Sequence, residues 1–511
     1  MTPICLLTKT LASVFFFLLC AQACAQSFPV LRAQRFFGTA TADFPSSLVV
    51  GPDSSLYVGG WSVDSAGLST GLLLKLHPSL EKVHWQLAPG GPSNDRITAL
   101  ALAPDGQGLL FGGTSGSQLP QPDAGDVRYG ADVWLGKVSA AGKLTQDKRL
   151  GGSGPDRLGG LVATSYGGFV FAGSTWSNDR DLPADQAPLS NLWFGLTSRT
   201  GELLRTSVWG GSGHEWATAL AATRDGGYVV AGVTTSPELD SSRLRVHGDA
   251  FLRKLDLTGQ PQWTCILKKP FEDVIHAVVE TEFGFVYAAG STTQEGQSRQ
   301  FWLLKLDGNG RQLWERVWGQ EGHEELNSLA LTRDGGLVAV GSSVYRQLSH
   351  PQVKGRSDLW VMRLDTNGKT IWQQTYGGPQ DETGVAVVEF RPGRYYVLGR
   401  KENRFRRGQL STGFDCWLLC IDELPCNQVG ASFVSDQRSA SVRVGTPIRF
   451  VNQSRHGDRW HWEFGDGQTS TEKSPAHRYG RAGTFIVRLT AYVNDKCRHT
   501  YVHPQPVVVV E

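Results

Sequence analysis

Methionine and cysteine are scarce in this chain of 511 residues, which has 2 methionines and 8 cysteines. Net charge is also small, because 50 Lys and Arg residues face 48 Asp and Glu residues and leave a formal balance of +2. Such a balance indicates no broad basic face, so nucleic acid is not an expected partner. After residue 25 no apolar run of about 18 residues follows, so we expect no transmembrane segment in the mature chain.

The usual motifs of catalytic and metal sites are missing as well. We find no nucleotide-binding fingerprint, no Gly-x-Ser-x-Gly elbow and no Ser/His/Asp order of note. His214-Glu215 and His323-Glu324 are adjacent His/acid pairs, but no His-x-x-x-His or Cys-x-x-Cys spacing lies near them. We interpret both pairs as solvated loop residues. The sequence therefore predicts no catalytic residues and no cofactor, and it leaves metal binding open.

The first 25 residues have the features of a secretory signal peptide. Lys9 precedes an apolar run over residues 11–19, and Ala23-Cys24-Ala25 forms an Ala-x-Ala cleavage site, which puts the mature start near Gln26. Lipidation at Cys20 or Cys24 is the alternative, but neither cysteine follows the small-residue pattern of a lipoprotein. We expect a secreted, cell-surface or periplasmic protein.

Five cysteines remain after cleavage: Cys265, Cys416, Cys420, Cys426 and Cys497. Cys416 and Cys420 are four residues apart on one predicted strand, roughly 13 Å, which is too far for a disulfide. Cys426 and Cys497 flank the C-terminal region and would form a disulfide in an oxidising compartment. Unpaired thiols are the alternative, since five is an odd number and sequence does not fix connectivity.

Glycine and tryptophan are abundant instead, with 61 and 16 residues, and they belong to a pattern that occurs seven times. The best copies begin at Gly210 and Glu321. In each copy a glycine ends the second strand: Gly60, Gly113, Gly173, Gly232, Gly290, Gly341 and Gly399. A period of this size is typical of propellers and solenoids, whose units bury faces against their neighbours.

Each copy divides into four short strands. In the sixth copy they cover residues 326–332, 337–341, 359–365 and 370–376, with hairpin turns at Asp334-Gly335-Gly336 and Thr366-Asn367-Gly368. Nearly continuous apolar strands such as Trp302-Leu303-Leu304 indicate sheets that are covered on both faces. We interpret the recurring Asp-x-x-Gly-x-x-x-Trp element, as in residues 307–314, as turn chemistry and tryptophan docking.

The seventh copy stops at Pro425 without a fourth strand, and residues 31–38 match the register of residues 372–377. Pairing the two ends would close the ring and leave no open edge. We therefore predict an all-β fold in which residues 26–425 form a seven-bladed β-propeller closed by the N-terminal strand. Six or eight blades are weaker alternatives, because no further copy is left over.

Residues 426–511 form a second predicted domain, a small β-sandwich with strands at 442–450, 459–464, 484–492 and 501–510. Residues 462–467 (WEFGDG), 475–479 (PAHRY) and 483–489 (GTFIVRL) resemble the PKD (polycystic-kidney-disease-type) domain. This resemblance implies an immunoglobulin-like sandwich used for adhesion, spacing, or carbohydrate and protein contact. It also implies that Trp462, Phe464 and Tyr479 are core residues. The propeller repeats resemble those of exported bacterial surface proteins of the Bacteroidota.

One acidic residue stands at the same place just before the first strand of every copy: Asp43, Asp95, Asp156, Glu215, Asp273, Glu324 and Glu382. Seven carboxylates at one register would encircle a channel mouth and suggest a cation site. The alternative, which we favour, is that each carboxylate accepts N–H bonds in its own loop or pairs with a nearby base.

Variable loops between the second and third strands lie on one face and are candidate binding segments. One contains Trp176 with Asp179, Asp181 and Asp185. Another contains the basic residues and the aromatic residue that we predict to bind an anionic glycan or an acidic protein: Arg400, Lys401, Arg404, Phe405, Arg406 and Arg407, with Arg394 nearby. A charged, solvated loop is the alternative.

Together these features predict an exported, non-enzymatic binding or scaffold protein. The propeller face would contact a surface protein or glycan, and the PKD-type domain would act as a spacer or adhesion module. The alternative is a propeller-type hydrolase or lyase that acts on polysaccharide, which would need carboxylates at a separation that sequence does not reveal.

Overall fold

The computed structural model describes residues 27–39, 42–91, 94–106, 108–116, 131–183, 189–237, 239, 248–269, 271–319, 322–344, 357–406, 409–437, 441–493 and 497–511, without the side chains of 403–412. The chain divides into two compact units. The large unit is Pro29–Leu424, and the C-terminal unit combines Met1–Phe28 with Pro425–Glu511. Across the described ranges the only helix is the short 3₁₀ turn Cys426–Gln428, so no helix there is long and apolar enough to cross a membrane.

The described strands of the large unit form seven propeller-like sheets of four strands each. Six of the sheets take four consecutive strands. They are β2–β5 (Ala42–Val50, Leu56–Val63, Ser69–Leu76, Val83–Leu87), β6–β9 (Asp95–Leu102, Gly108–Ser115, Asp132–Ser139, Leu144–Leu150), β10–β13 (Asp156–Ala163, Phe169–Thr175, Asn191–Thr197, Leu203–Trp209), β14–β17 (Glu215–Ala222, Tyr228–Thr234, Asp249–Leu255, Pro261–Leu267), β18–β21 (Asp273–Glu280, Val286–Thr293, Arg299–Leu306, Gln312–Trp318) and β22–β25 (His323–Leu331, Leu337–Val344, Ser357–Leu364, Thr370–Tyr376).

The other sheet joins the two ends of the large unit in the order β1–β28–β27–β26. Its strands are β26 (Glu382–Arg391), β27 (Arg394–Arg406), β28 (Gln409–Pro425) and β1 (Ser27–Phe37). The Trp417 indole N–H donates to Gln34 Oε1 at 3.0 Å, and the rings of Phe36 and Trp417 stack at 5.7 Å. Residues 31–37 thus lie beside the strand to which the sequence assigned them.

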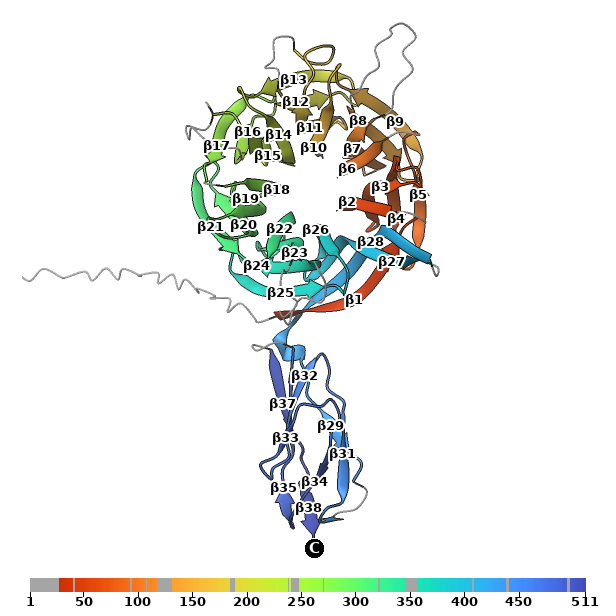
Figure 1. The fold of residues 1–511 in the computed structure, drawn as a ribbon, viewed down its shortest axis with the longest axis vertical. Helices are drawn as coiled ribbons and strands as arrows, with labels where there is room; N and C mark the ends of the chain where they lie inside the picture. Colours follow the sequence, from red (N-terminus) through yellow and green to blue (C-terminus); the bar gives the residue numbers. More distant parts are fainter. Residues whose placement is uncertain are drawn as a thin grey trace, which may run out of the picture. The chain divides into compact units, whose positions relative to one another are not determined.

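Figure 1 shows the sheets around a common centre, with the first strand of each innermost and the last strand outermost. First strands of adjacent sheets contact one another, and β26 also contacts β2. Second and third strands are buried on both faces, as in β15 and β24, where every residue is buried. Each sheet is therefore covered by its two neighbours, which explains the continuous apolar strands of the sequence.

Turns of one sheet dock on tryptophans of the preceding sheet. Gly310 has φ of 80° at a hairpin turn, and a Cβ there would lie 2.6 Å from the Trp263 ring. Trp263 donates its indole N–H to the Gly308 carbonyl oxygen at 2.9 Å. Only glycine adopts this backbone without strain while leaving room for the ring. The Asp-x-x-Gly-x-x-x-Trp element is therefore structural here.

The C-terminal unit is a set of short strands in three sheets. The strands are β29 (Phe433–Ser435), β30 (Val442–Arg443), β31 (Pro447–Asn452), β32 (Arg459–Glu463), β33 (Thr469–Ser470), β34 (Ala476–Arg478), β35 (Gly483–Phe485), β36 (Arg488–Tyr492), β37 (Arg498–Val502) and β38 (Val507–Val510). Trp462, Phe464 and Tyr479 are fully buried, as the resemblance implied. A disulfide joins Cys426 to Cys497, and the three other described cysteines are free.

Candidate binding site

The seven acidic residues at the shared register are buried structural groups. Their exposed fraction is 1% or less in every case. In five of them, a backbone N–H four residues earlier donates to the carboxylate, at 2.7 Å from Gly91 to Asp95 and 2.9 Å from Gly211 to Glu215. Hydroxyl groups of the second strand also donate to these carboxylates. One example is the Thr234 hydroxyl, which donates to Glu215 at 2.6 Å. In these five sheets the carboxylate thus ties the entry loop to its own sheet.

This geometry corrects one interpretation of the sequence and supports another. Glu215 and Glu324 are not solvated, because each belongs to its first strand rather than to the loop before it and faces the second strand. For the acidic register, the N–H bonds to five of the carboxylates agree with the interpretation that we favoured from the sequence. Among the described residues, no group of three or more His, Cys, Asp or Glu side chains is placed to hold a metal ion.

Glycines precede these carboxylates because a side chain would occupy the same space. A Cβ on Gly377 would collide with the buried Asp358 carboxylate and lie 2.8 Å from Glu382 Oε2. We expect Gly377→Ala to lower the free energy of unfolding by about 1–3 kcal/mol, as overpacking does elsewhere. Gly308→Ala is the matched control, because a Cβ there meets only a carbonyl oxygen at 3.4 Å. Equal denaturation midpoints for the two variants would contradict this explanation.

Burial also makes these carboxyls sensitive to pH. It raises the pKa of Asp156 and of Asp273 from 3.8 to about 6, and in Asp156 the nearby Asp132 carboxylate adds to the effect. Between pH of about 4 and about 6, the folded state therefore binds more protons than the unfolded state. The free energy of unfolding falls as the pH rises through this range. For one such carboxyl, the free energy of unfolding falls by about 3 kcal/mol over the whole range.

We expect Asp156→Asn to reduce the slope of stability against pH in this window. Urea unfolding at several pH values between 4 and 7 measures it. Asp105→Asn, at a half-exposed hairpin carboxylate, is the control and should leave the slope as it is. An unchanged slope in the Asp156 variant would show that this carboxyl ionises freely in the folded protein.

The basic segment after β26 is a hairpin and not the loop that the sequence predicted. β27 continues to Arg406 and pairs with β28 as far as Gln409. These two strands therefore stay paired beyond the part of the sheet that β26 joins. Lys401 is held by the buried Glu382 at 2.7 Å, and Arg394 is paired with Asp422 at 2.5 Å. Arg407 and the side chains of Arg404, Phe405 and Arg406 lie outside the described residues.

Trp176 lines a cleft between β10, β11 and β14. We call this the Trp176 cleft; its volume is about 360 Å³. The guanidinium of Arg157 lies 5.7 Å from the centre of the Trp176 ring, and the centre of the His214 ring lies 6.4 Å from it. His214 Nδ1 lies 3.0 Å from the Ser190 hydroxyl. Eight residues line it: Arg157, Leu158, Ser174, Trp176, Ser190, His214, Trp216 and Ala217.

The walls of this cleft are fixed by hydrogen bonds of the loop that carries Trp176. The Trp176 N–H donates to the Pro155 carbonyl oxygen at 3.1 Å. Asp179 and Asp181 accept backbone N–H bonds from Ser153 and Gly151, at 2.7 and 2.9 Å. These two carboxylates, which the sequence marked as possible ligand groups, therefore hold the loop, while Asp185 lies outside the described residues. A site held in this way is formed before any ligand arrives.

A second aromatic group occurs where β26–β28, β2, β3 and β6 come together. Its members are Arg400, Phe414, Phe44, Trp61 and Arg96, and we call it the Trp61 stack. Phe44 lies between Phe414 at 5.7 Å and Trp61 at 5.4 Å between ring centres. The guanidinium groups of Arg400 and Arg96 cover the two outer rings at 5.2 and 5.6 Å. Sequence reasoning singled out Arg400 but missed its aromatic partners, which come from distant parts of the chain.

Among the described residues, Arg96, Arg157 and Arg400 each lie over an aromatic ring and have no acidic partner within ion-pair distance. Arg149 makes a useful contrast: it covers Trp134 at 5.8 Å but is paired with Asp147 at 3.1 Å. Arg96 and Arg157 are also exposed. A positive charge held on an aromatic ring without a counter-ion is available to an anionic ligand.

Comparison with known proteins assigns the C-terminal part. Residues 434–508 match the PKD domain family. This unit contains a PKD domain. A pre-pro-metalloprotease, PrtV of Vibrio cholerae, is 28% identical over 149 residues, which is 29% of this chain and 15% of the protease, so the chain spans a small fraction of that relative.

Two solved structures are among those that match parts of this chain. The PKD1 domain of Vibrio anguillarum Epp is 30% identical, with coverage of 16% of this chain and 95% of that domain, and a TM-score of 0.14. The WD40 domain of Neurospora crassa Pan2 is 11% identical, with coverage of 77% and 96% and a TM-score of 0.47.

Proposed function

We propose that this chain is an exported surface protein that binds a surface protein or glycan through the face that carries the Trp176 cleft. The observation that carries the proposal is a preformed cleft in which an unpaired guanidinium lies over an indole that is 38% exposed. Loops and strand ends on a rigid scaffold commonly carry binding. The PKD domain then acts as a spacer or a second adhesion module.

The architecture that we infer for this function is a seven-bladed propeller closed by β1. The position of β1 beside β28 and the contact between β26 and β2 support a continuous ring. Export through a signal peptide over residues 1–25 fits the Ala-x-Ala site. An extracellular location also fits the PKD domain and the likeness to a protease precursor.

We further propose that the protein is not an enzyme. Glycoside hydrolysis needs a pair of carboxyl groups at a defined separation. The residues that line the Trp176 cleft include no carboxyl group, and His214 is the one histidine among them. The buried carboxylates near the cleft are occupied by hydrogen bonds within the fold, as Asp156 is with the Gly152 N–H at 2.9 Å and the Ser177 hydroxyl at 3.0 Å.

Binding of the full mature chain to a glycan array and to a panel of purified surface proteins tests the proposal. We expect Trp176→Ala to weaken binding of any ligand found by at least about tenfold, or 1.4 kcal/mol. Phe283→Ala is the control, because Phe283 is 78% exposed in the turn between β18 and β19, at the opposite ends of the strands. Ligands that bind the wild-type chain and the Trp176 variant equally would overturn the proposed site.

A further inference from the structure

We infer that this face binds an acidic polysaccharide built of uronate residues, an inference that rests on the proposed function. The Trp176 cleft and the Trp61 stack repeat one arrangement, in which a guanidinium without an acidic partner covers an aromatic ring. Arg157 does so over Trp176 at 5.7 Å and Arg96 over Trp61 at 5.6 Å. Each is therefore a combined apolar and cationic site.

A uronate residue has the two complementary features. Its pyranose ring presents C–H groups that contact the exposed part of an indole, and its carboxylate accepts paired N–H bonds from a guanidinium. A phosphate group would need the cation but not the aromatic ring. A glutamate or aspartate side chain would supply the carboxylate without a ring. The combination of both groups therefore favours a sugar acid over a phosphate or an acidic peptide.

The placement of these sites favours a polymer over a single sugar. Arg96 and Arg157 each follow a buried carboxylate at the start of the first strand, in adjacent sheets, so they lie on the same face. The same position holds Phe44 in the sheet before them and Trp216 in the sheet after them. Four consecutive sheets thus present an aromatic ring or a guanidinium at one register, which suits a chain with a repeating unit.

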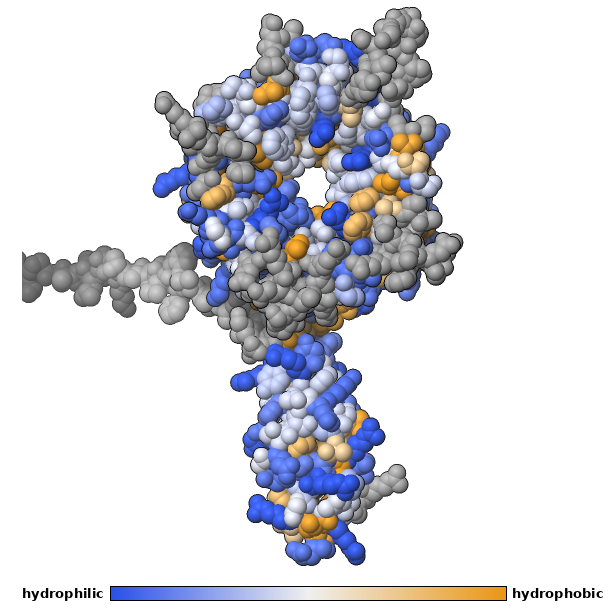
Figure 2. Space-filling view, viewed as in Figure 1, coloured by the Kyte–Doolittle hydropathy of each residue, from blue (hydrophilic) through white to orange (hydrophobic). Residues whose placement is uncertain are grey.

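Other sheets do not continue this series. The same position holds Val274 in β18 and Glu325 in β22, and Glu325 lies 3.7 Å from Arg299, which also pairs with Glu272 at 2.9 Å. An acidic residue at this register would repel a polyanion. In the coloured part of Figure 2, apolar residues form separate patches on a mostly hydrophilic surface.

Affinity electrophoresis of the full mature chain through polygalacturonate tests the inference. The same polymer with its carboxyl groups reduced to alcohols is the comparison, since it keeps the rings and loses the charge. We expect retention by polygalacturonate that weakens with added salt, and retention by the reduced polymer that is at least tenfold weaker. Polyglutamate at equal charge density should retain the protein less than polygalacturonate.

Arg157→Gln and Arg96→Gln should each weaken retention by polygalacturonate several-fold, and the double variant by at least tenfold. Both side chains are exposed, so the variants should keep the wild-type melting temperature. Arg316→Gln is the matched control, because Arg316 covers Trp314 at 5.1 Å on the outer strand β21, away from the first strands.

Equal retention of the double variant and the wild type would overturn the inference, as would stronger retention by polyglutamate or by the reduced polymer. These outcomes are separable from failure of the proposed function. If polygalacturonate never retains the protein while Trp176→Ala abolishes binding of a neutral glycan or a surface protein, the cleft binds a ligand and only the acidic-polysaccharide assignment fails.

Discussion

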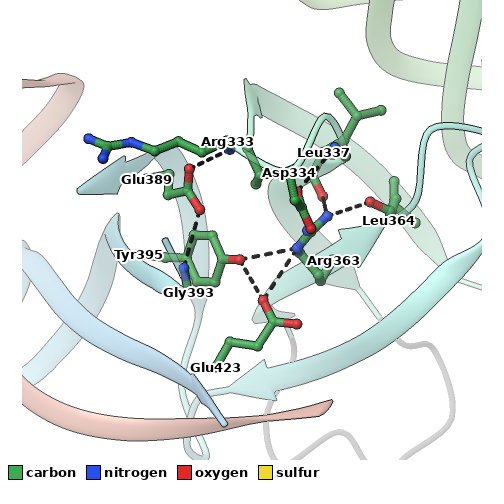
Figure 3. A network of polar contacts seen from close by, with 11 residues as sticks. Arg333, Asp334, Leu337, Arg363, Leu364, Glu389, Gly393, Tyr395 and Glu423 are labelled. Atoms are coloured by element: carbon green, nitrogen blue, oxygen red, sulfur yellow. Dashed lines mark hydrogen bonds and ion pairs between the residues drawn. The ribbon is translucent and has the colours of Figure 1, made fainter. Parts of the chain in front are cut away.

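Replacing Arg363 with methionine should lower the free energy of unfolding of the large unit by about 3–5 kcal/mol, the cost of removing one partner from a buried ion pair. Its side chain is 2% exposed and connects two sheets (Figure 3). Its Nε donates to the Tyr395 hydroxyl at 3.1 Å and to Glu423 at 3.3 Å, and another nitrogen pairs with Asp334.

Methionine would fill much of the space but would supply no donors. The Leu364 carbonyl oxygen, which accepts from Arg363 at 2.6 Å, would lose this donor. The carboxylate of Glu423, which is 14% exposed, would lose the guanidinium and keep the hydrogen bond from the Tyr395 hydroxyl at 2.6 Å. Unsatisfied buried acceptors and a buried charge carry most of the expected cost. Arg363→Lys should recover part of the stability, because it keeps the charge but not the planar set of donors.

Urea denaturation at neutral pH measures these differences. Arg316→Met is the control for loss of charge, since Arg316 is exposed on the outer strand β21 and a change there should cost less than about 0.5 kcal/mol. If the Arg363 and Arg316 variants had the same denaturation midpoint, the network of Figure 3 would contribute nothing measurable.

The position of Arg363 also explains a recurring feature that sequence reasoning did not use. The same place, one residue before the end of the apolar run in the third strand, holds Lys75, Lys254 and Lys305. Lys254 pairs with Asp225 in its own sheet at 2.8 Å and lies 3.6 Å from Glu280 in the next. A cation here joins adjacent sheets, and a single sequence reveals its spacing but not its partners.

The parts of the fold that sequence predicts best depend on local chemistry. The hairpin at Asp334-Gly335-Gly336 forms as predicted, with φ of 85° at Gly335, because Gly tolerates that backbone. The acidic register was also visible from repetition alone. The burial of those carboxylates was not visible in the sequence. It depends on hydroxyl groups such as that of Thr234, which is 19 residues further along the chain than Glu215.

The candidate site was also predicted only in part, because its contacts join residues that are far apart in the sequence. Trp176 and Arg400 were identified from the composition of their loops, and both belong to aromatic and cationic groups. Lys401 was identified in the same way, but the buried Glu382 on the facing strand holds it. The sequence around Arg400 and Lys401 does not reveal which of the two is paired with an acidic residue. The Trp61 stack unites residues 44, 61, 96, 400 and 414, and such a set becomes visible only when the ends of the chain are brought together.

Deleting residues 27–37 should abolish the cooperative unfolding of the large unit, a larger effect than any single substitution. The deletion removes β1, one of four strands in its sheet, and leaves β28 with an unpaired edge. Trp417 would lose the acceptor on Gln34 and the ring of Phe36. A domain is stable by only about 5–15 kcal/mol, so the loss of a whole strand exceeds what the remaining contacts can offset.

Calorimetry and size-exclusion chromatography measure the outcome, with a chain that lacks residues 426–511 as the control. That control keeps every strand of the large unit after Phe28, so it should retain a sharp melting transition. A synthetic peptide of residues 27–38, added to the deletion variant, should restore the transition, and a scrambled peptide should not, because only the native order places Gln34 and Phe36 against Trp417. A deletion variant that melts at the temperature of the control without the peptide would show that β1 is dispensable, and ring closure by the N-terminal strand would then be wrong.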